Sequence, residues 1–249
     1  MNVDLSVVVT CYNYKDYIRE CILSCINQNT EFNYEIIVID DGSTDGSQEI
    51  IESFSDEILF FPKKNSGVES SSNFGIKKSN GKFITRLDAD DFYNKNFIQK
   101  SLERIINSDL DDFAFTYSNY SAVDENSDTL WKSNLPVFCL QEVFSRGDFL
   151  ASGTIFSREA LFEVGLYNEE KPNCGLENFE LVLKLLKKGR IGLLNELNLF
   201  NYRIHNKNMS HTRRKAIIDY GFELCENLNI GPYKTNEYHP YKLEVNNEI

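Results

Sequence analysis

Strand-like and helix-like hydrophobic patterns alternate from Leu5 to Asp91, and this alternation restricts the folds open to the chain. Residues 5–10 form a β-branched run suited to a strand buried on both faces, and residues 16–28 then place apolar side chains at helical spacing. The pattern repeats, with strands expected at 34–39, 57–61 and 82–87 and helices at 44–54 and 67–79. We therefore predict an α/β fold whose open, mainly parallel sheet is flanked by helices and binds ligands beyond the carboxyl ends of its strands.

The second half of the chain is less regular. Helices are expected at 97–106 and 176–188, and strands at 112–118, 153–156 and 191–202. Residues 122–135 form a polar excursion that carries the only tryptophan, Trp131. A chain of 249 residues is too short for two ordinary independent domains, so we expect a single compact unit.

The formal net charge of −12 limits the ligands that the protein can bind. Nucleic-acid-binding proteins need clustered Lys and Arg to release counterions from the phosphate backbone, so we expect no nucleic-acid partner. An acidic protein that holds an anionic ligand needs the help of a metal ion or of helix N-termini, because its own field repels phosphate.

We expect no segment of this sequence to cross a membrane. No stretch approaches the roughly 20 apolar residues that a membrane helix needs, and the N-terminus does not have the pattern of a signal peptide. The six cysteines include no Cys-x-x-Cys pair, and free thiols suit a reducing compartment. We therefore expect a cytoplasmic location. The basic run 213–215 either contacts anionic headgroups at the inner membrane face or is simply solvated.

A carboxylate pair, Asp88 and Asp90, comes directly after the fourth predicted strand. There the two side chains would lie at the carboxyl edge of the sheet, where hard oxygen ligands can hold Mn²⁺ or Mg²⁺ while phosphate oxygens take the metal's remaining positions. The same Asp-x-Asp pattern occurs at 109–111, but there it precedes a strand, in a polar loop. Position, and not the triplet alone, therefore singles out Asp88 and Asp90 as candidate metal ligands.

Two further polar runs follow predicted strands. Asp40 and Asp41 stand in the run IDDGSTDGS, which is typical of a tight turn and helix cap but also places carboxylates at the sheet edge. Residues 65–81 are rich in small side chains, which either form a flexible loop or let the backbone approach phosphate or ribose closely. Three strand-end runs at the spacing of successive βα units would line one crevice.

The order of these motifs resembles that of the family 2 glycosyltransferases, which are inverting enzymes of the GT-A fold. The matching stretches are SVVVTCYNYKDYIRECILSCINQ (6–28), EIIVIDDGSTDGS (35–47), NSGVESSSNFGIKKSNGKFITRLDADD (65–91) and YRIHNKNMS (202–210). The resemblance is strong over residues 5–91 and patchy from there to residue 210. It implies a nucleotide-sugar-binding half at 1–110, an acceptor-binding half of the same domain at 111–210 and a C-terminal tail at 211–249.

The resemblance also implies which side chains hold the donor. Thr10 and Tyr12 would contact the nucleobase, and Asp41 would hydrogen-bond it, usually as uracil. The remaining donor-site residues would be Gly67 and Asn73 along the nucleotide, Asp88 at the ribose or metal, Asp90 on the metal, Arg203 near the diphosphate, and His205 as a further metal ligand.

The family's catalytic base normally lies in a Glu-Asp pair that opens a helix in the acceptor half. The matching residues here are Glu177 and Asn178, and an amide cannot accept a proton at neutral pH. The base would then be Glu177 or Glu180, unless the acceptor is activated otherwise. Glu177 also suits a purely structural role, because the helix macrodipole favours a carboxylate at an N-terminus. Lys184 replaces a usual arginine in the same stretch.

The resemblance implies a hexosyl- or N-acetylhexosaminyltransferase that moves a single sugar, with inversion and metal assistance, from a UDP-sugar to a glycan or lipid-linked glycan. A sugar-phosphate nucleotidyltransferase is disfavoured because residues 10–16 contain no glycine. A processive synthase is disfavoured because we expect no membrane helix and find no Gln-x-x-Arg-Trp motif around Trp131. Asn178 leaves a catalytically impaired nucleotide-sugar-binding protein as the alternative.

Overall fold

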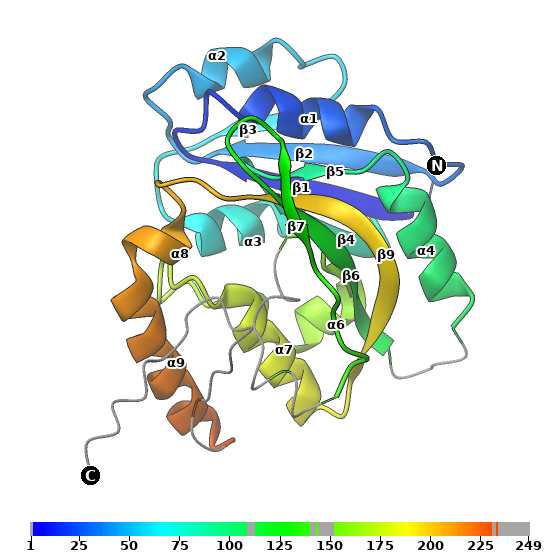
Figure 1. Cartoon of the computed structure of the whole chain (residues 1–249), viewed down its shortest axis with the longest axis vertical. Helices are drawn as coiled ribbons and strands as arrows, with labels where there is room; N and C mark the ends of the chain where they lie inside the picture. The colour runs from blue at the N-terminus through cyan, green and yellow to red at the C-terminus, as the bar shows by residue number, and fades with distance from the viewer. Residues whose placement is uncertain (1, 109–112, 140–142, 144–151, 231–232, 234–249) are drawn as a thin grey trace.

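A curled sheet with helices on both sides forms the centre of the protein (Figure 1). The structure is a computed structural model that describes residues 2–108, 113–139, 143, 152–230 and 233. In the first half, four strands pair in parallel in the order β3-β2-β1-β4, namely β1 (Leu5–Cys11), β2 (Tyr34–Asp40), β3 (Leu59–Pro62) and β4 (Phe83–Asp88). Every residue of β1 is buried, as its apolar run predicts.

Three helices cover the parallel strands. α1 (Ile18–Ile26) and α2 (Ser47–Glu52) lie together on one side of the sheet, and α3 (Val68–Lys78) lies on the other (Figure 1). Each helix connects two parallel strands, so the chain repeats the strand–helix–strand unit that places helices on both faces. The alternation predicted from the hydrophobic periods is therefore confirmed.

The second half adds strands in both directions, so the complete sheet is mixed. β8 (Ile155–Ser157) pairs antiparallel with β4 and with β6 (Phe113–Val123). β9 (Ile191–Arg203) pairs in parallel with β6 and antiparallel with the short β5 (Phe92–Tyr93). The described strands follow the order β3-β2-β1-β4-β8-β6-β9-β5. Only the first four strands thus form a segment in which all the pairing is parallel. Beyond β4, parallel and antiparallel pairs are mixed.

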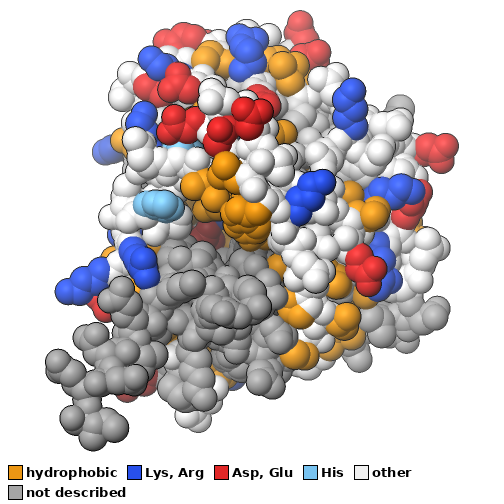
Figure 2. All heavy atoms as spheres, viewed as in Figure 1, with side chains coloured by type: hydrophobic (Ala, Val, Ile, Leu, Met, Phe, Trp, Pro, Cys, Tyr) orange, Lys and Arg blue, Asp and Glu red, His pale blue; other side chains and the backbone are white. Residues whose placement is uncertain are grey.

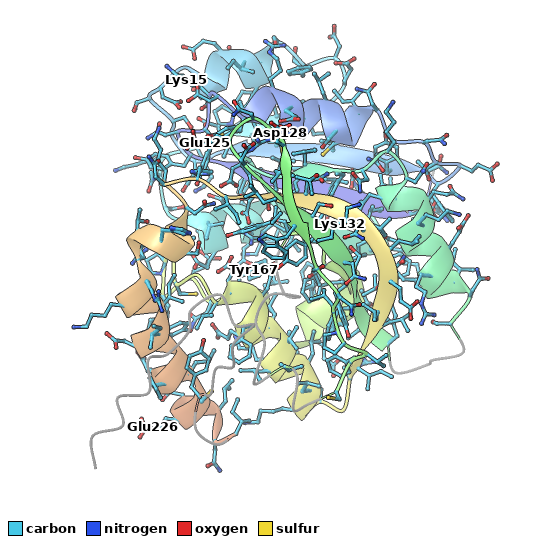
Figure 3. All side chains as sticks on the ribbon, in the orientation of Figure 1. Lys15, Glu125, Asp128, Lys132, Tyr167 and Glu226 are labelled. Carbon is cyan, nitrogen blue, oxygen red and sulfur yellow. The ribbon has the colours of Figure 1, made fainter. Side chains whose placement is uncertain are left out.

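The polar excursion predicted at 122–135 is largely a β-hairpin. β6 continues to Val123, and β7 (Thr129–Lys132) pairs antiparallel with its last residues. The tip of this hairpin carries Glu125 and Asp128 and approaches α1 (Figure 3), where the Ser127 hydroxyl donates to the Glu20 carboxylate at 3.1 Å. All four residues of β7 are exposed, so the strand lacks the alternation that would have identified it.

The remaining helices pack against the second half of the sheet or against one another. They are α4 (Phe97–Ile106), α6 (Arg158–Glu163), α7 (Glu177–Lys187), α8 (Met209–Thr212) and α9 (Arg214–Leu228). α9 and the last two residues of α8 lie in the segment 211–249, which the sequence indicated as a tail. α9 buries Ile217 and Leu224, and the Tyr220 hydroxyl donates to Glu180 of α7 at 2.7 Å. This part of the chain therefore contributes to the packed structure.

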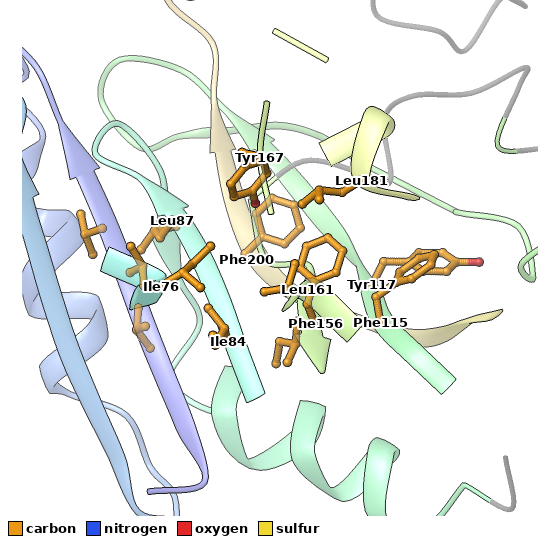
Figure 4. Packing of buried hydrophobic residues seen from close by; sticks show 14 of the residues in the cluster. Ile76, Ile84, Leu87, Phe115, Tyr117, Phe156, Leu161, Tyr167, Leu181 and Phe200 are labelled. Atoms are coloured by element: carbon orange, nitrogen blue, oxygen red, sulfur yellow. The ribbon is translucent and has the colours of Figure 1, made fainter. Parts of the chain in front are cut away.

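One hydrophobic core runs through both halves. Figure 4 shows Ile76 of α3 and Leu87 of β4 on one side of it and Phe115, Phe156 and Phe200 on the other. Buried side chains from both halves pack into this one cluster. Among the described residues, no helix combines the length and the hydropathy that crossing a bilayer requires.

The close contact between α3 and β1 gives a test of this packing. A Cβ added at Gly75 would lie 2.4 Å from the Val8 Cγ1 atom of β1, which is fully buried. We expect Gly75→Ala to lower the free energy of unfolding by about 2 kcal/mol, because α3 must move off the sheet. Lys77→Ala, at an exposed position of the same helix, is the control in urea denaturation. Equal stability of the two variants would contradict this packing.

Candidate active site

A cavity of about 580 Å³ opens beyond the carboxyl ends of β1, β2 and β4. The strand register creates it, since Thr10 of β1 is paired with Asp88 of β4, and the neighbouring Cys11 is paired with Asp40 of β2. α7 and the segment after β9 close the cavity from the other side. Six of the residues predicted from the sequence line it, namely Thr10, Tyr12, Asp41, Asp88, Asp90 and Glu177. The crevice that the motif spacing predicts is therefore present.

Asp41 lines the cavity and uses both carboxylate oxygens. Oδ1 accepts from Lys63 Nζ at 2.6 Å and from the Ser66 amide at 3.0 Å, and Oδ2 accepts from the Gly67 amide at 2.9 Å. Gly67 has a φ of +93°, which a residue with a Cβ adopts with difficulty. Asp41 and Lys63 thus fix the loop that leads from β3 into α3.

Asn73 joins the two halves of the protein. Its side chain accepts from the Tyr167 amide at 3.0 Å and donates to the Tyr167 carbonyl at 2.9 Å and to Glu169 at 2.8 Å. It is buried and is not among the residues that line the cavity. Its predicted contact with the nucleotide stays a prediction, and the structure adds a positioning role for it.

Asp88, the last residue of β4, and Asp90, in the turn that follows it, both face the cavity. Arg86 Nη1 donates to Asp88 Oδ1 at 2.8 Å, and the Ser152 hydroxyl donates to Asp88 Oδ2 at 3.0 Å. Asp90 Oδ2 lies 3.0 Å from His205 Nε2 and 3.4 Å from Asn208 Nδ2. Burial raises the pKa of Asp88, and the Asp90 carboxylate adds to this, although the Arg86 guanidinium opposes it.

The neighbouring Asp91 increases the negative charge at this turn. Its Oδ1 accepts from the Arg203 amide at 2.9 Å, and its Oδ2 is buried and has no hydrogen-bond partner in the described part of the chain. Burial and the carboxylates of Asp90 and Asp88 raise its pKa well above the ordinary value. Three carboxylates crowded in this way repel one another, and a divalent cation would relieve the repulsion.

The donor atoms at this turn fit a hard cation. Asp88 and Asp90 both offer carboxylate oxygens to the cavity, and Mn²⁺ and Mg²⁺ prefer such ligands. Glu69, Cys174 and Glu177 form a second group of ligand-type side chains, with ligand atoms within 4.8 Å of one another. There, however, burial raises the pKa of the Cys174 thiol far above neutrality, so the thiol stays protonated. The Asp88–Asp90 turn is the better candidate metal site.

His205 is buried beside this turn, and both of its ring nitrogens are engaged. Nδ1 accepts from the Lys207 amide at 3.2 Å, so Nε2 carries the proton that points to Asp90 in the neutral ring. In this arrangement the ring orients the Asp90 carboxylate. Its predicted role as a metal ligand remains a prediction.

Arg203 is buried behind the turn and does not line the cavity. Its Nε donates to the Asp90 carbonyl at 2.9 Å, its Nη1 donates to the Asp124 carbonyl at 2.9 Å, and its Nη2 pairs with Glu20 at 2.5 Å. It therefore holds the turn at Asp90, the β6–β7 hairpin and α1 together. Its predicted contact with the diphosphate stays a prediction.

Glu177 faces the cavity from the N-terminus of α7. Its Oε1 pairs with Arg86 Nη2 at 2.8 Å, and its Oε2 is buried with no hydrogen-bond partner in the described part of the chain. Burial raises the pKa of Glu177, and Glu69 and Asp88 add to this, against the opposing effect of Arg86. Arg86 therefore links the candidate metal site to the candidate base.

The other candidates on α7 are placed differently. Asn178 lines the cavity, and its Oδ1 accepts from the Tyr167 hydroxyl at 2.8 Å. Glu180 is buried, accepts from the Tyr220 hydroxyl and pairs with Lys184 at 2.6 Å. It is not among the residues that line the cavity. The geometry therefore favours Glu177 over Glu180 as the proton acceptor.

The sequence contained a signal for Arg86 that motif spacing did not use. An arginine in an otherwise apolar buried strand needs a charged partner, and side chains two apart on a strand share a face. Arg86 and Asp88 are such a pair. The contact with Glu177 carried no comparable signal, because 91 residues separate the two along the chain.

Comparison with known proteins agrees with the motif order. The sequence model described as glycosyl transferase family 2 matches residues 6–162. An uncharacterized glycosyltransferase of Rickettsia typhi is 28% identical over 227 residues, which cover 87% of this chain and 69% of that protein. An uncharacterized glycosyltransferase of Haemophilus influenzae is 40% identical over 129 residues, half of each protein.

Solved structures show the same fold. The crystal structure of S. aureus TarS 1-349 in complex with UDP-GlcNAc matches with a TM-score of 0.71 and 19% identity, over 90% of this chain and 66% of that one. At this identity the match supports the fold, which is the GT-A fold that the resemblance implied. The cavity at the carboxyl edge, its carboxylate turn and the family match over more than half of the sequence agree, and the chain belongs to glycosyl transferase family 2.

Proposed function

We propose that this glycosyltransferase moves one sugar, with inversion, from a UDP-sugar to a glycan or lipid-linked glycan, assisted by Mn²⁺ or Mg²⁺. The observation that carries the proposal is the cavity, which brings Thr10, Tyr12 and Asp41 together with Asp88, Asp90 and Glu177. In this proposal Thr10, Tyr12 and Asp41 contact the nucleobase, Asp88 and Asp90 hold the metal at the diphosphate, and Glu177 acts on the acceptor. The solved TarS complexes with UDP and UDP-GlcNAc support a UDP donor.

Asp88 and Asp90 would hold the metal, which when bound would neutralise negative charge on the leaving diphosphate. Arg86 holds Asp88 through two hydrogen bonds, of 2.8 and 3.3 Å, and His205 and Asn208 orient Asp90. These contacts restrict the rotation of both carboxylates. The chain thereby provides a pre-arranged pair of oxygen ligands, which lowers the reorganisation needed when the donor binds.

Glu177 would accept the proton of the acceptor hydroxyl. Arg86 fixes its Oε1, and its Oε2 has no hydrogen-bond partner among the described residues, so Oε2 is the oxygen that would take the proton. The raised pKa of Glu177 brings its basicity closer to what proton transfer near neutral pH requires. Because Arg86 also donates to Asp88, it holds the candidate base and the candidate metal ligand at fixed positions relative to each other.

Asn178 favours a second candidate function, a nucleotide-sugar-binding protein without efficient turnover. Its amide lines the cavity where the family usually has a carboxylate.

We propose a cytoplasmic site of action for either function, with Lys215, which is exposed at the start of α9, as a point of peripheral membrane contact.

Release of UDP from a panel of UDP-sugars, with Mn²⁺ and with EDTA, tests the proposal. We expect metal-stimulated release that at least one sugar acceptor accelerates. Saturable binding of a UDP-sugar without release would identify a binding protein, and neither binding nor release would refute the proposal.

Lys63 gives a prediction for the nucleobase end. Its ammonium joins Asp41 to the Ser66 and Ser71 hydroxyls, so Lys63→Met removes the charge that holds the loop. We expect the affinity for UDP to fall about tenfold in calorimetry, because a hydrogen bond to a charged group is lost. Lys64→Met makes the same change at the exposed neighbouring side chain and should bind like wild type. Equal affinities would exclude a role for Lys63 in donor binding.

A further inference from the structure

Trp131, the only tryptophan of the chain, plays no part in the function proposed above. It lies on β7, at the edge of the sheet, and 48% of its surface is exposed. Its position in the register is specific, because Trp131 is paired with Ala122 of β6, which is in turn paired with Tyr202 of β9. Residues opposite one another on neighbouring strands point to the same face. Trp131, Ala122 and Tyr202 therefore form a row across three strands.

This row is continuous with the cavity. The ring of Tyr120, two residues before Ala122 and on the same face, lies 5.6 Å from the Trp131 ring and 6.2 Å from the Tyr202 ring between centroids. Tyr120 and Tyr202 both line the cavity. On the side of the molecule seen in Figure 2, hydrophobic side chains gather near the middle of the view, in the region of the β6–β7 hairpin. A row of neighbouring aromatic rings thus connects the cavity to the exposed Trp131.

We propose that Trp131 binds a pyranose ring of the acceptor outside the donor cavity. A pyranose presents an apolar C–H face that packs on an indole ring, and polar edges that need hydrogen-bonding neighbours. The exposed indole offers the apolar contact, the small Ala122 leaves room beside it, and the polar edges of the sugar can stay in contact with water because all four residues of β7 are exposed. The inference rests on the proposed function, because it takes the acceptor to be a carbohydrate.

The charge of the hairpin favours a sugar over a membrane surface. Glu125 and Asp128 lie at its tip (Figure 3), and Asp124 is hydrogen-bonded to Asp128 in the same turn, next to the strand that carries Trp131. Anionic headgroups attract basic segments and are repelled by carboxylates. A neutral pyranose meets no such repulsion.

Because Trp131 is the only tryptophan, the tryptophan fluorescence of the protein reports on this position alone. The whole 249-residue chain is titrated with the methyl glycosides of glucose, galactose, N-acetylglucosamine and N-acetylgalactosamine, with and without UDP and Mn²⁺. We expect at least one glycoside to shift or quench the emission saturably. In calorimetry, Trp131→Ala should bind that glycoside about tenfold more weakly, and Trp131→Phe, which keeps a ring, should bind it nearly as well as wild type.

Leu130→Ala is the matched control, since Leu130 is an equally exposed neighbour whose side chain points to the other face of the strand. It should bind glycoside like wild type, and Trp131→Ala should keep its affinity for UDP. An unchanged emission with every glycoside, or equal glycoside affinity in Trp131→Ala, would overturn the inference, even if UDP-sugar turnover upholds the proposed function. A shift caused only by phosphatidylglycerol vesicles would also overturn it and indicate a membrane contact. If the wild-type protein neither binds UDP nor turns over a UDP-sugar, the proposed function itself is contradicted.

Discussion

Asp90→Asn is expected to lower the turnover of UDP-sugar in the presence of Mn²⁺ by about a thousandfold, because the diphosphate loses the metal that would neutralise it. The fold should survive the change. Asparagine has the same shape, and its amide oxygen can still accept from the His205 ring and the Asn208 amide. Binding of Mn²⁺, measured by electron paramagnetic resonance in the presence of UDP, should weaken in parallel with turnover.

The sequence contains its own control for this experiment. Asp109 and Asp111 repeat the Asp-x-Asp pattern, and they lie outside the described residues. Asp111→Asn should leave turnover and Mn²⁺ binding at wild-type values, since the predicted metal site depends on position at the end of β4. Near-normal turnover in Asp90→Asn with Mn²⁺ present would remove Asp90 from the metal site.

Glu177→Gln is expected to lower turnover by about a thousandfold while leaving the affinity for UDP unchanged, because only proton acceptance is lost. Arg86 retains Asp88 as a charged partner, so the protein should remain folded in thermal melting. Glu180→Gln changes the other predicted base on the same helix. Because Glu180 pairs with Lys184 and Tyr220 away from the cavity, that variant should lose some stability and little turnover.

The pH dependence gives an independent check on Glu177. Only the ionised carboxylate accepts a proton, so turnover should fall as the pH falls through the pKa of Glu177. Burial raises that pKa, so the fall should begin above the ordinary glutamate value of 4.5. The contribution of Glu177 to the free energy of unfolding should depend on pH in the opposite direction to turnover. A carboxyl whose pKa is raised on folding contributes fully below its unfolded pKa, and that contribution is lost as the pH rises through the folded value.

Asn178→Asp separates the two functions that Asn178 leaves open. If Glu177 is the base, the new carboxylate should change turnover little, because the Tyr167 hydroxyl still holds this side chain. An increase of about a hundredfold or more, together with unchanged turnover in Glu177→Gln, would show that the natural chain lacks an efficient base. That combination would favour the nucleotide-sugar-binding protein.

The sequence by itself determined the strand–helix alternation and the edge at which the site forms. Hydrophobic period is a local property of the backbone, so β1, β2 and β4 could be predicted from their own residues. Parallel strands joined by helices bring their carboxyl ends to one edge, which is why Asp41, Asp88 and Asp90 were expected to share a cavity and do.

Tertiary structure decided the rest. The hairpin that carries Trp131, the helix formed by residues 214–228 and the pairing of Arg86 with Glu177 all depend on contacts between segments far apart in the chain. Motif spacing treated Glu177 and Glu180 as equal candidates, and the packing of α7 against α9 separates them. The physical reason is that a hydrophobic period reports which face of an element is buried, whereas the partner of a buried charge is set by which elements meet in the folded protein.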